Sequence, residues 1–131
     1  MTQRNRSIAV HKHKRHRTAN NKAPAHNRNA TVTLCHSRTQ NVEAYTREAD
    51  IVICATGRAR AFGAQHVAAH QTILDVGINF DETGALCGDV DYDAVAPIVG
   101  ALTPVPGGVG GITTAVLMDH VVRAAQEQCA R

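Results

Sequence analysis

Residues 50–57 read Asp-Ile-Val-Ile-Cys-Ala-Thr-Gly, a nearly continuous apolar run that ends at a glycine. A strand that is covered on both faces has this composition, and such strands are typical of parallel sheets. A second apolar run, residues 72–76, follows after a turn at residues 58–60 and a weakly helical piece at residues 65–69. Two buried strands joined by a short helical crossover form a right-handed βαβ unit. The sequence therefore predicts an α/β fold with a parallel sheet.

Upstream of this unit, alternating β-branched residues at positions 31–34 predict another strand. Ser37 and Arg38 follow it, at the carboxyl end of the strand, where open α/β sheets bind their ligands. A hydroxyl group and a guanidinium at this position suit the ribose or the phosphate of an adenosine nucleotide. The alternative is a polar loop in which Thr39 or Asn41 caps a short helix.

Residues 103–114 read Thr-Pro-Val-Pro-Gly-Gly-Val-Gly-Gly-Ile-Thr-Thr. Prolines restrict the backbone and glycines remove Cβ atoms, so this loop suits close contact with a flat ligand. Residues 112–128 carry apolar side chains at helical spacing, which predicts an amphipathic helix whose apolar face is buried. The loop therefore ends at a helix N-terminus, where free N–H groups and the positive end of the helix dipole lie.

The first 29 residues differ in composition from the rest, because they carry eight of the 14 Lys and Arg residues and no Asp or Glu. Their few aliphatic residues, at positions 8–10, are adjacent and form no amphipathic face. We therefore expect a disordered basic arm at residues 1–29 and one folded domain at residues 30–131. The basic block at residues 11–17 suits nonspecific contact with phosphates, which keeps a basic-armed nucleic-acid binder as an alternative function.

The four cysteines are far apart and form no C-x-x-C pair, which favours reduced thiols and a cytoplasmic protein. No apolar run approaches the roughly 20 residues of a membrane span, so we expect no membrane association. Two patterns superficially suit a metal: His66 with His70, and the three aspartates within residues 89–93. The first lacks a third ligand and the second lacks the bidentate glutamate of a calcium loop, so we predict no metal site.

Four segments resemble, in order and spacing, the bifunctional methylenetetrahydrofolate dehydrogenase/methenyltetrahydrofolate cyclohydrolase family: residues 30–39, 49–57, 73–79 and 103–114. The last segment is similar to the family's Pro-Gly-Gly-Val-Gly-Pro-Met-Thr signature. The resemblance covers residues 29–128 and corresponds to the later part of the family's cofactor-binding domain. It implies a truncated Rossmann-like parallel sheet with flanking helices, and therefore a partial NAD(P)-binding domain at residues 30–131.

The resemblance also implies a role in one-carbon folate metabolism and purine biosynthesis. The reaction would be NADP-dependent oxidation of 5,10-methylenetetrahydrofolate to 5,10-methenyltetrahydrofolate, followed by hydrolysis to 10-formyltetrahydrofolate. The implied cofactor is NADP, the implied substrate is a folate, and the implied assembly is a homodimer. The implied cofactor contacts are Ser37, Arg38 and Ile78. The implied substrate contacts are the loop residues Pro104, Val105, Pro106, Gly107, Gly108 and Val109.

Two parts of the family pattern have no match in this chain. Residues 1–29 contain no glycine, so the Gly-Arg-Ser turn that holds the cofactor phosphates in the family is represented only by Asn-Arg-Ser at residues 5–7. Tyr45 and Tyr92 have no lysine four residues later, so the family's catalytic Tyr-x-x-x-Lys segment is missing and we assign no catalytic residue. A reading-frame error in the coding sequence is one hypothesis for the composition of residues 1–29.

These departures predict that the chain is inactive alone. An alternative is a non-catalytic nucleotide-binding module that pairs with a separate catalytic chain. In the family, the helix at residues 112–128 returns towards the catalytic domain, so its apolar face is expected here to be exposed or used for dimerisation.

Overall fold

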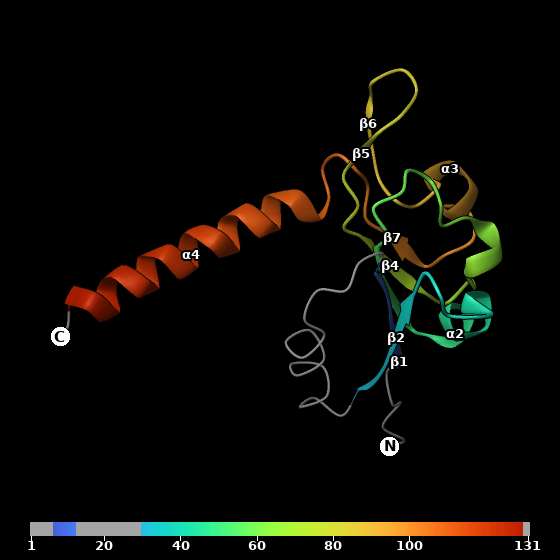
Figure 1. Cartoon of the computed structure of the whole chain (residues 1–131), viewed down its shortest axis with the longest axis horizontal. Coiled ribbons are helices and arrows are strands. Elements are labelled where there is room, and N and C mark those ends of the chain that lie inside the picture. Colours follow the sequence, from blue (N-terminus) through green and yellow to red (C-terminus); the bar gives the residue numbers. More distant parts are fainter. Residues whose placement is uncertain (1–6, 13–29, 130–131) are drawn as a thin grey trace.

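The computed structural model of the chain describes residues 7–12 and 30–129 (Figure 1). Within them, five strands form a parallel sheet in the order β2-β1-β3-β4-β7. The strands are β1 (Ser7–Lys12), β2 (Thr31–His36), β3 (Ile51–Ala55), β4 (Thr72–Asp75) and β7 (Ala101–Leu102). Helical segments lie in the connections from β2 to β3, from β3 to β4 and from β4 to β7. The predicted α/β fold with a Rossmann-like parallel sheet is confirmed.

The prediction of a disordered arm over residues 1–29 is wrong for Ser7–Lys12. These residues form β1, which pairs in parallel with β2 on one edge and with β3 on the other. The prediction failed because it required an amphipathic pattern, whereas an inner strand of a parallel sheet reads as an adjacent aliphatic run such as residues 8–10. The rest of that prediction concerns residues 1–6 and 13–29, which lie outside the described residues.

The hydrophobic core lies against β3 and β4. Alternate residues of β3, Val52 and Cys54, are fully buried together with Ile73 of β4. Phe62 and Val95, from the connections that follow β3 and precede β7, complete this cluster. The core therefore anchors the two strands whose carboxyl ends lead into the cavities described below.

The helical elements in the crossovers are short. They are α2 (Val42–Glu48) between β2 and β3, the 3-10 helix η1 (Ala64–His66) between β3 and β4, and α3 (Tyr92–Val95) before β7. Asn41 is the N-cap of α2, as one of the two interpretations of this segment expected, although its side chain makes no capping hydrogen bond. A separate antiparallel pair consists of β5 (Asn79–Phe80) and β6 (Leu86–Cys87).

Gln71 joins α2 to the segment that precedes β4. Its side chain is fully buried, and its Nε2 donates to the main-chain oxygens of Thr46 at 2.5 Å and Ala49 at 2.6 Å. Its Oε1 accepts from the main-chain N–H of Ala68 at 2.7 Å. One carboxamide thus satisfies three main-chain groups at the end of α2 and before β4, as buried polar groups require.

The last helix, α4 (Val109–Cys129), begins three residues before its predicted start, so Gly110 and Gly111 are helical. Figure 1 shows that α4 runs outward from the sheet instead of along it. None of its described residues is buried, and Leu117 and Val121 are more than half exposed. The expectation of burial within the chain is therefore wrong. The two alternatives, an exposed face and a face used for dimerisation, stay predictions.

All four cysteines are free in the structure, and the prediction of reduced thiols stays a prediction. Cys35, Cys54 and Cys87 are buried, whereas Cys129 is exposed near the end of α4. Among the described residues, no helix combines the length and the apolar character that a bilayer crossing requires.

Candidate functional site

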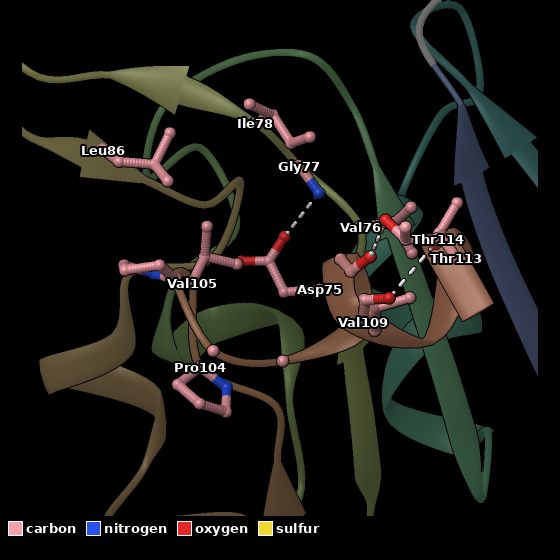
Figure 2. A pocket seen from close by; sticks show the side chains of 14 residues that line it. Asp75, Val76, Gly77, Ile78, Leu86, Pro104, Val105, Val109, Thr113 and Thr114 are labelled. Carbon is pink, nitrogen blue, oxygen red and sulfur yellow. Dashed lines mark hydrogen bonds between the residues drawn. The ribbon is translucent and has the colours of Figure 1, made fainter.

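A large cavity opens where β4 and β7 end. Its volume is about 410 Å³, and Figure 2 shows its walls. One wall is the segment that follows β4, and the other is the proline- and glycine-rich loop with the first turn of α4. The lining residues are Asp75, Val76, Gly77, Ile78, Leu86, Pro104, Val105, Pro106, Gly107, Gly108, Val109, Gly110, Thr113 and Thr114.

The loop between β7 and α4 is held at both ends. At its start, the Thr103 hydroxyl accepts a hydrogen bond from the Asp75 main-chain N–H at 2.8 Å. Gly107 adopts a φ of 98°, a conformation that strongly favours glycine. At its end, Thr113 Oγ1 donates to the Val109 main-chain oxygen at 3.1 Å within the first turn of α4. The loop contributes two prolines, two valines and two glycines to the cavity lining.

All of the residues predicted to contact a folate, Pro104 to Val109, line this cavity. Ile78, predicted on the cofactor side, lines the same cavity and is 73% exposed. The sequence analysis thus named two groups of residues that the fold brings together from different parts of the chain. An apolar wall with few polar groups suits a planar ring system.

A smaller cavity of about 180 Å³ lies at the ends of β2 and β3. It is lined by His36, Ser37, Thr39, Val42, Thr56, Arg58 and Ala61. Ser37 is therefore where the prediction placed it, at the carboxyl edge of the sheet. Arg38 adjoins the cavity in sequence without lining it, and its main-chain N–H donates to His36 Nδ1 at 3.1 Å.

Thr56 and Arg58, which line the smaller cavity from the loop after β3, were not predicted from the sequence. The available signal was their position on either side of Gly57, the glycine that ends the apolar run at residues 50–57. In open α/β sheets, loops at the carboxyl ends of strands bind ligands, so this loop carried the same expectation as the loop after β2.

Two buried carboxylates organise the loops between the cavities. Asp75 is 3% exposed, and its oxygens accept from the main-chain N–H groups of Gly77 at 2.8 Å, Asp89 at 3.1 Å and Val90 at 2.9 Å. In Figure 2 its carboxylate lies between Gly77 and Val105. Gly88 passes so close that a Cβ atom there would overlap the Asp75 carboxylate. The segment after β6 is therefore docked directly on the end of β4.

The buried thiols next to this region are poor nucleophiles. Burial raises the pKa of the Cys54 thiol, and the nearby carboxylates of Asp75 and Asp89 raise it further. Burial also raises the pKa of the Cys35 thiol. Both side chains therefore remain protonated near neutral pH, in which form a thiol is a poor nucleophile.

His66, half of the histidine pair that superficially suits a metal, has a packing role. Its ring stacks on Phe62 with a centroid distance of 4.6 Å, and its Nε2 lies 3.7 Å from Glu43 Oε1. Its Nδ1 accepts the main-chain N–H of Gly63 at 3.1 Å. Among the described residues, no group of three or more His, Cys, Asp or Glu side chains is arranged to hold a metal ion.

Comparison with known families identifies the lineage. The family model described as "Tetrahydrofolate dehydrogenase/cyclohydrolase, NAD(P)-binding domain" matches residues 19–129. The chain belongs to this family. The match begins inside the segment of residues 1–29 that the sequence analysis set apart, ten residues or so before the predicted domain boundary.

Curated members of the tetrahydrofolate dehydrogenase/cyclohydrolase family are similar over most of the chain. "Bifunctional protein FolD 1" from Desulfitobacterium hafniense (strain Y51) is 55% identical over 100 residues, which are 76% of this chain and 36% of that protein. "Bifunctional protein FolD" from Methanoculleus marisnigri is 55% identical over 100 residues, with coverage of 76% and 35%. The chain thus spans about a third of the length of these relatives.

Solved structures of the family share the fold. The bifunctional 5,10-methylenetetrahydrofolate dehydrogenase/cyclohydrolase of Thermoplasma acidophilum superposes with a TM-score of 0.82 at 33% identity, over 97% of this chain and 46% of that one. The Trypanosoma brucei N5,N10-methylenetetrahydrofolate dehydrogenase-cyclohydrolase, complexed with NADP cofactor and inhibitor, gives a TM-score of 0.79 at 28% identity, with coverage of 96% and 45%.

Proposed function

We propose that this chain is the NADP-binding part of an enzyme of one-carbon folate metabolism. The enzyme oxidises 5,10-methylenetetrahydrofolate to 5,10-methenyltetrahydrofolate with NADP and hydrolyses the product to 10-formyltetrahydrofolate. The observation that carries the proposal is the shared cavity of Ile78 and the loop from Pro104 to Val109, at the carboxyl edge of the sheet, in a chain of this family. The related Trypanosoma brucei enzyme, whose structure contains NADP, supports the choice of cofactor.

In this proposal the two cavities bind different parts of the cofactor, and the larger one also binds the folate. The adenosine end of NADP occupies the smaller cavity, where Ser37 offers a hydroxyl group and Arg38 supplies positive charge beside it. Ile78 packs against the nicotinamide end in the larger cavity, and the loop from Pro104 to Val109 lies along the folate ring. The cofactor supplies the redox chemistry when bound, and the chain orients it.

The catalytic acid and base groups come from outside this chain. No Tyr-x-x-x-Lys segment is present in the sequence, and the part of the chain that matches the Desulfitobacterium hafniense relative covers only 36% of that protein. We infer that the chain binds NADP but turns over methylenetetrahydrofolate only together with a catalytic domain, either in a longer polypeptide or on a separate chain. A cytoplasmic location, a homodimeric assembly and a contribution to purine biosynthesis belong to the same proposal.

The first test measures NADP and NAD binding by calorimetry to the 131-residue chain and to an Arg38→Ala variant. Loss of a charged hydrogen-bonding partner should weaken NADP binding about tenfold and leave NAD binding nearly unchanged. Arg47→Ala, an exposed arginine in the last turn of α2, is the matched control and should bind NADP like the unmodified chain. An equal loss of affinity for NADP and for NAD in Arg38→Ala would contradict the assigned contact.

The second test measures dehydrogenase activity. The chain alone should not reduce NADP in the presence of methylenetetrahydrofolate, whereas addition of a family catalytic domain should produce activity that depends on both proteins. Activity of the isolated chain at a normal enzyme rate would refute the inference that the catalytic groups are supplied from elsewhere.

The described residues do not favour the nucleic-acid alternative. Part of the basic block lies in β1, which is an inner strand of the sheet, and the remainder lies in residues 13–29, outside the described part. Salt-dependent retention on DNA that disappears when residues 1–29 are deleted would be required to revive that alternative.

A further inference from the structure

Asp89 is a fully buried carboxylate surrounded by main-chain amides. Its Oδ2 accepts from the N–H groups of Thr56 and of Gly57, the latter at 3.0 Å. Its Oδ1 accepts from the N–H of Arg58 at 3.2 Å and from Asn79 Nδ2 at 2.8 Å. Three successive residues of the loop after β3 therefore direct their N–H groups at one side chain.

Main-chain amides, in place of a cationic side chain, stabilise the buried negative charge of Asp89. None of the ion pairs found among the described residues includes Asp89. A buried carboxylate without donors carries a large desolvation penalty, so the donors and the carboxylate hold one another in place. A loop whose successive amides converge on one anion has its backbone direction fixed over those residues.

Asp89 also connects this loop to the larger cavity. Its own main-chain N–H donates to Asp75 Oδ1 at 3.1 Å, and the same Asp75 oxygen accepts the N–H of Gly77 at 2.8 Å. Asp75 and Gly77 line the larger cavity, whereas Thr56 and Arg58 line the smaller one. Asp89 itself lines neither of these two cavities, so it acts on ligands only through the loops that it holds.

We propose that Asp89 is a positioning residue for dinucleotide binding. Its carboxylate fixes residues 56–58 as the wall of the smaller cavity. It also fixes the position of this wall relative to the wall that Asp75 and Gly77 contribute to the larger cavity. This inference rests on the proposed function, because the ligand that spans both cavities is taken to be NADP. The dinucleotide then meets a loop that is already ordered, and loses less binding free energy to ordering it.

The test compares Asp89→Asn with Asp81→Asn by NADP calorimetry on the 131-residue chain. Asn presents an NH₂ group where Asp89 accepts loop amides, so two donors face each other and residues 56–58 lose their fixed direction. We expect the Kd for NADP to rise about tenfold or more, with an unchanged number of sites per folded chain. A merely structural role would lower the number of competent sites and leave the Kd of the remaining molecules unchanged.

Asp81 is a matched control because it is also an aspartate that accepts several hydrogen bonds. Its Oδ1 accepts from the N–H of Thr83 at 2.9 Å, from Thr83 Oγ1 at 2.6 Å and from the N–H of Ala85 at 3.0 Å, in the exposed turn between β5 and β6. Neither cavity described above includes Asp81. Asp81→Asn removes the same charge and should leave the Kd for NADP unchanged.

A spectroscopic measurement tests the mechanism directly. In ¹H–¹⁵N spectra, amide protons that donate to a carboxylate resonate downfield, so the signals of Thr56, Gly57 and Arg58 should move upfield in Asp89→Asn and stay in place in Asp81→Asn. Unchanged signals at residues 56–58 would overturn the proposal, as would an unchanged Kd for NADP in a folded Asp89→Asn variant.

A milder variant decides the question if Asp89→Asn does not fold. Asn79→Ala removes one donor from Asp89 Oδ1 while leaving the carboxylate in place, and Asn79 lines neither cavity. A Kd for NADP raised about threefold supports the proposal, and an unchanged Kd overturns it. If the unmodified chain itself binds no NADP, the proposed function fails. If the unmodified chain binds NADP and the variants bind it equally well, only the role of Asp89 fails.

Discussion

At the scale of single residues, the site depends on aspartates whose partners are mostly main-chain amides. Asp75 and Asp89 are buried, and together they accept hydrogen bonds from six main-chain N–H groups. The sequence could not predict this, because an aspartate near the end of a strand reads equally as a ligand, a cap or a solvated loop residue. The main-chain partners of the Asp89 carboxylate lie more than 30 residues away in the chain, and only the fold brings them together.

The reactivity of the thiols tests whether Cys54 is buried and Cys129 exposed. Cys129 is exposed, whereas Cys54 is buried and has its pKa raised by burial and by the carboxylates of Asp75 and Asp89. A disulfide reagent at pH 8 should label Cys129 rapidly and Cys54 only after denaturant is added. Peptide mapping by mass spectrometry identifies the labelled residue, and rapid labelling of Cys54 in the folded chain would contradict the described core.

Asp81 gives a pH dependence whose sign follows from its hydrogen bonds. The hydrogen bond from Thr83 and that from the Ala85 main chain, helped by the nearby Arg60, hold the pKa of the Asp81 carboxyl below its ordinary value. The stability it contributes is therefore present above its ordinary pKa and is lost as pH falls through the lowered pKa. Denaturant unfolding between pH 5 and 2 should show a smaller loss of stability in Asp81→Asn than in the unmodified chain.

At the scale of elements, the boundaries of the strands were predicted better than the side-chain contacts that join the elements, and Gln71 illustrates why. The apolar runs at residues 50–57 and 72–76 predicted β3 and β4 to within a residue or two, because buried parallel strands have a recognisable composition. The carboxamide that ties α2 to the start of β4 had no sequence signal, since a glutamine before a strand is usually exposed.

Replacement of Gln71 by leucine should destabilise the fold. The change removes three hydrogen bonds and leaves the main-chain oxygens of Thr46 and Ala49 without this donor. We expect the free energy of unfolding to fall by about 2–3 kcal/mol, as is typical for buried polar groups that lose a partner. Gln65→Leu, at an exposed position in η1, is the control and should change stability by less than about 0.5 kcal/mol.

The helix α4 should be the least stable element in the described part of the isolated chain. None of its described residues is buried, and isolated helices of ordinary composition are marginal in water because tertiary packing provides most helical stability. Native-state hydrogen exchange should therefore show faster exchange for amides at residues 113–129 than for those of β3. Equal protection of α4 and β3 would mean that the apolar face is covered in solution.

At the scale of the whole molecule, the sequence predicted the fold class and the family. It assigned Ile78 to the cofactor and the loop from Pro104 to Val109 to the folate, and the fold places both in the lining of one cavity. It failed on the segment Ser7–Lys12, because an inner parallel strand carries no amphipathic signal and the surrounding charge suggested disorder. It failed on the burial of α4, because an apolar helix face indicates that a partner is needed without showing that one is present. The chain spans about a third of the length of its relatives, and its matched part corresponds to the family's NAD(P)-binding domain.

The most direct test of the central claim, that NADP binds along the carboxyl edge of this sheet, is an NMR titration of the 131-residue chain with NADP. We expect saturable shifts at both cavities, in the amides of Ser37, of residues 56–58 and of Ile78, with little change along residues 115–129 of α4. Absence of saturable shifts at this edge, or shifts confined to other parts of the chain, would contradict it.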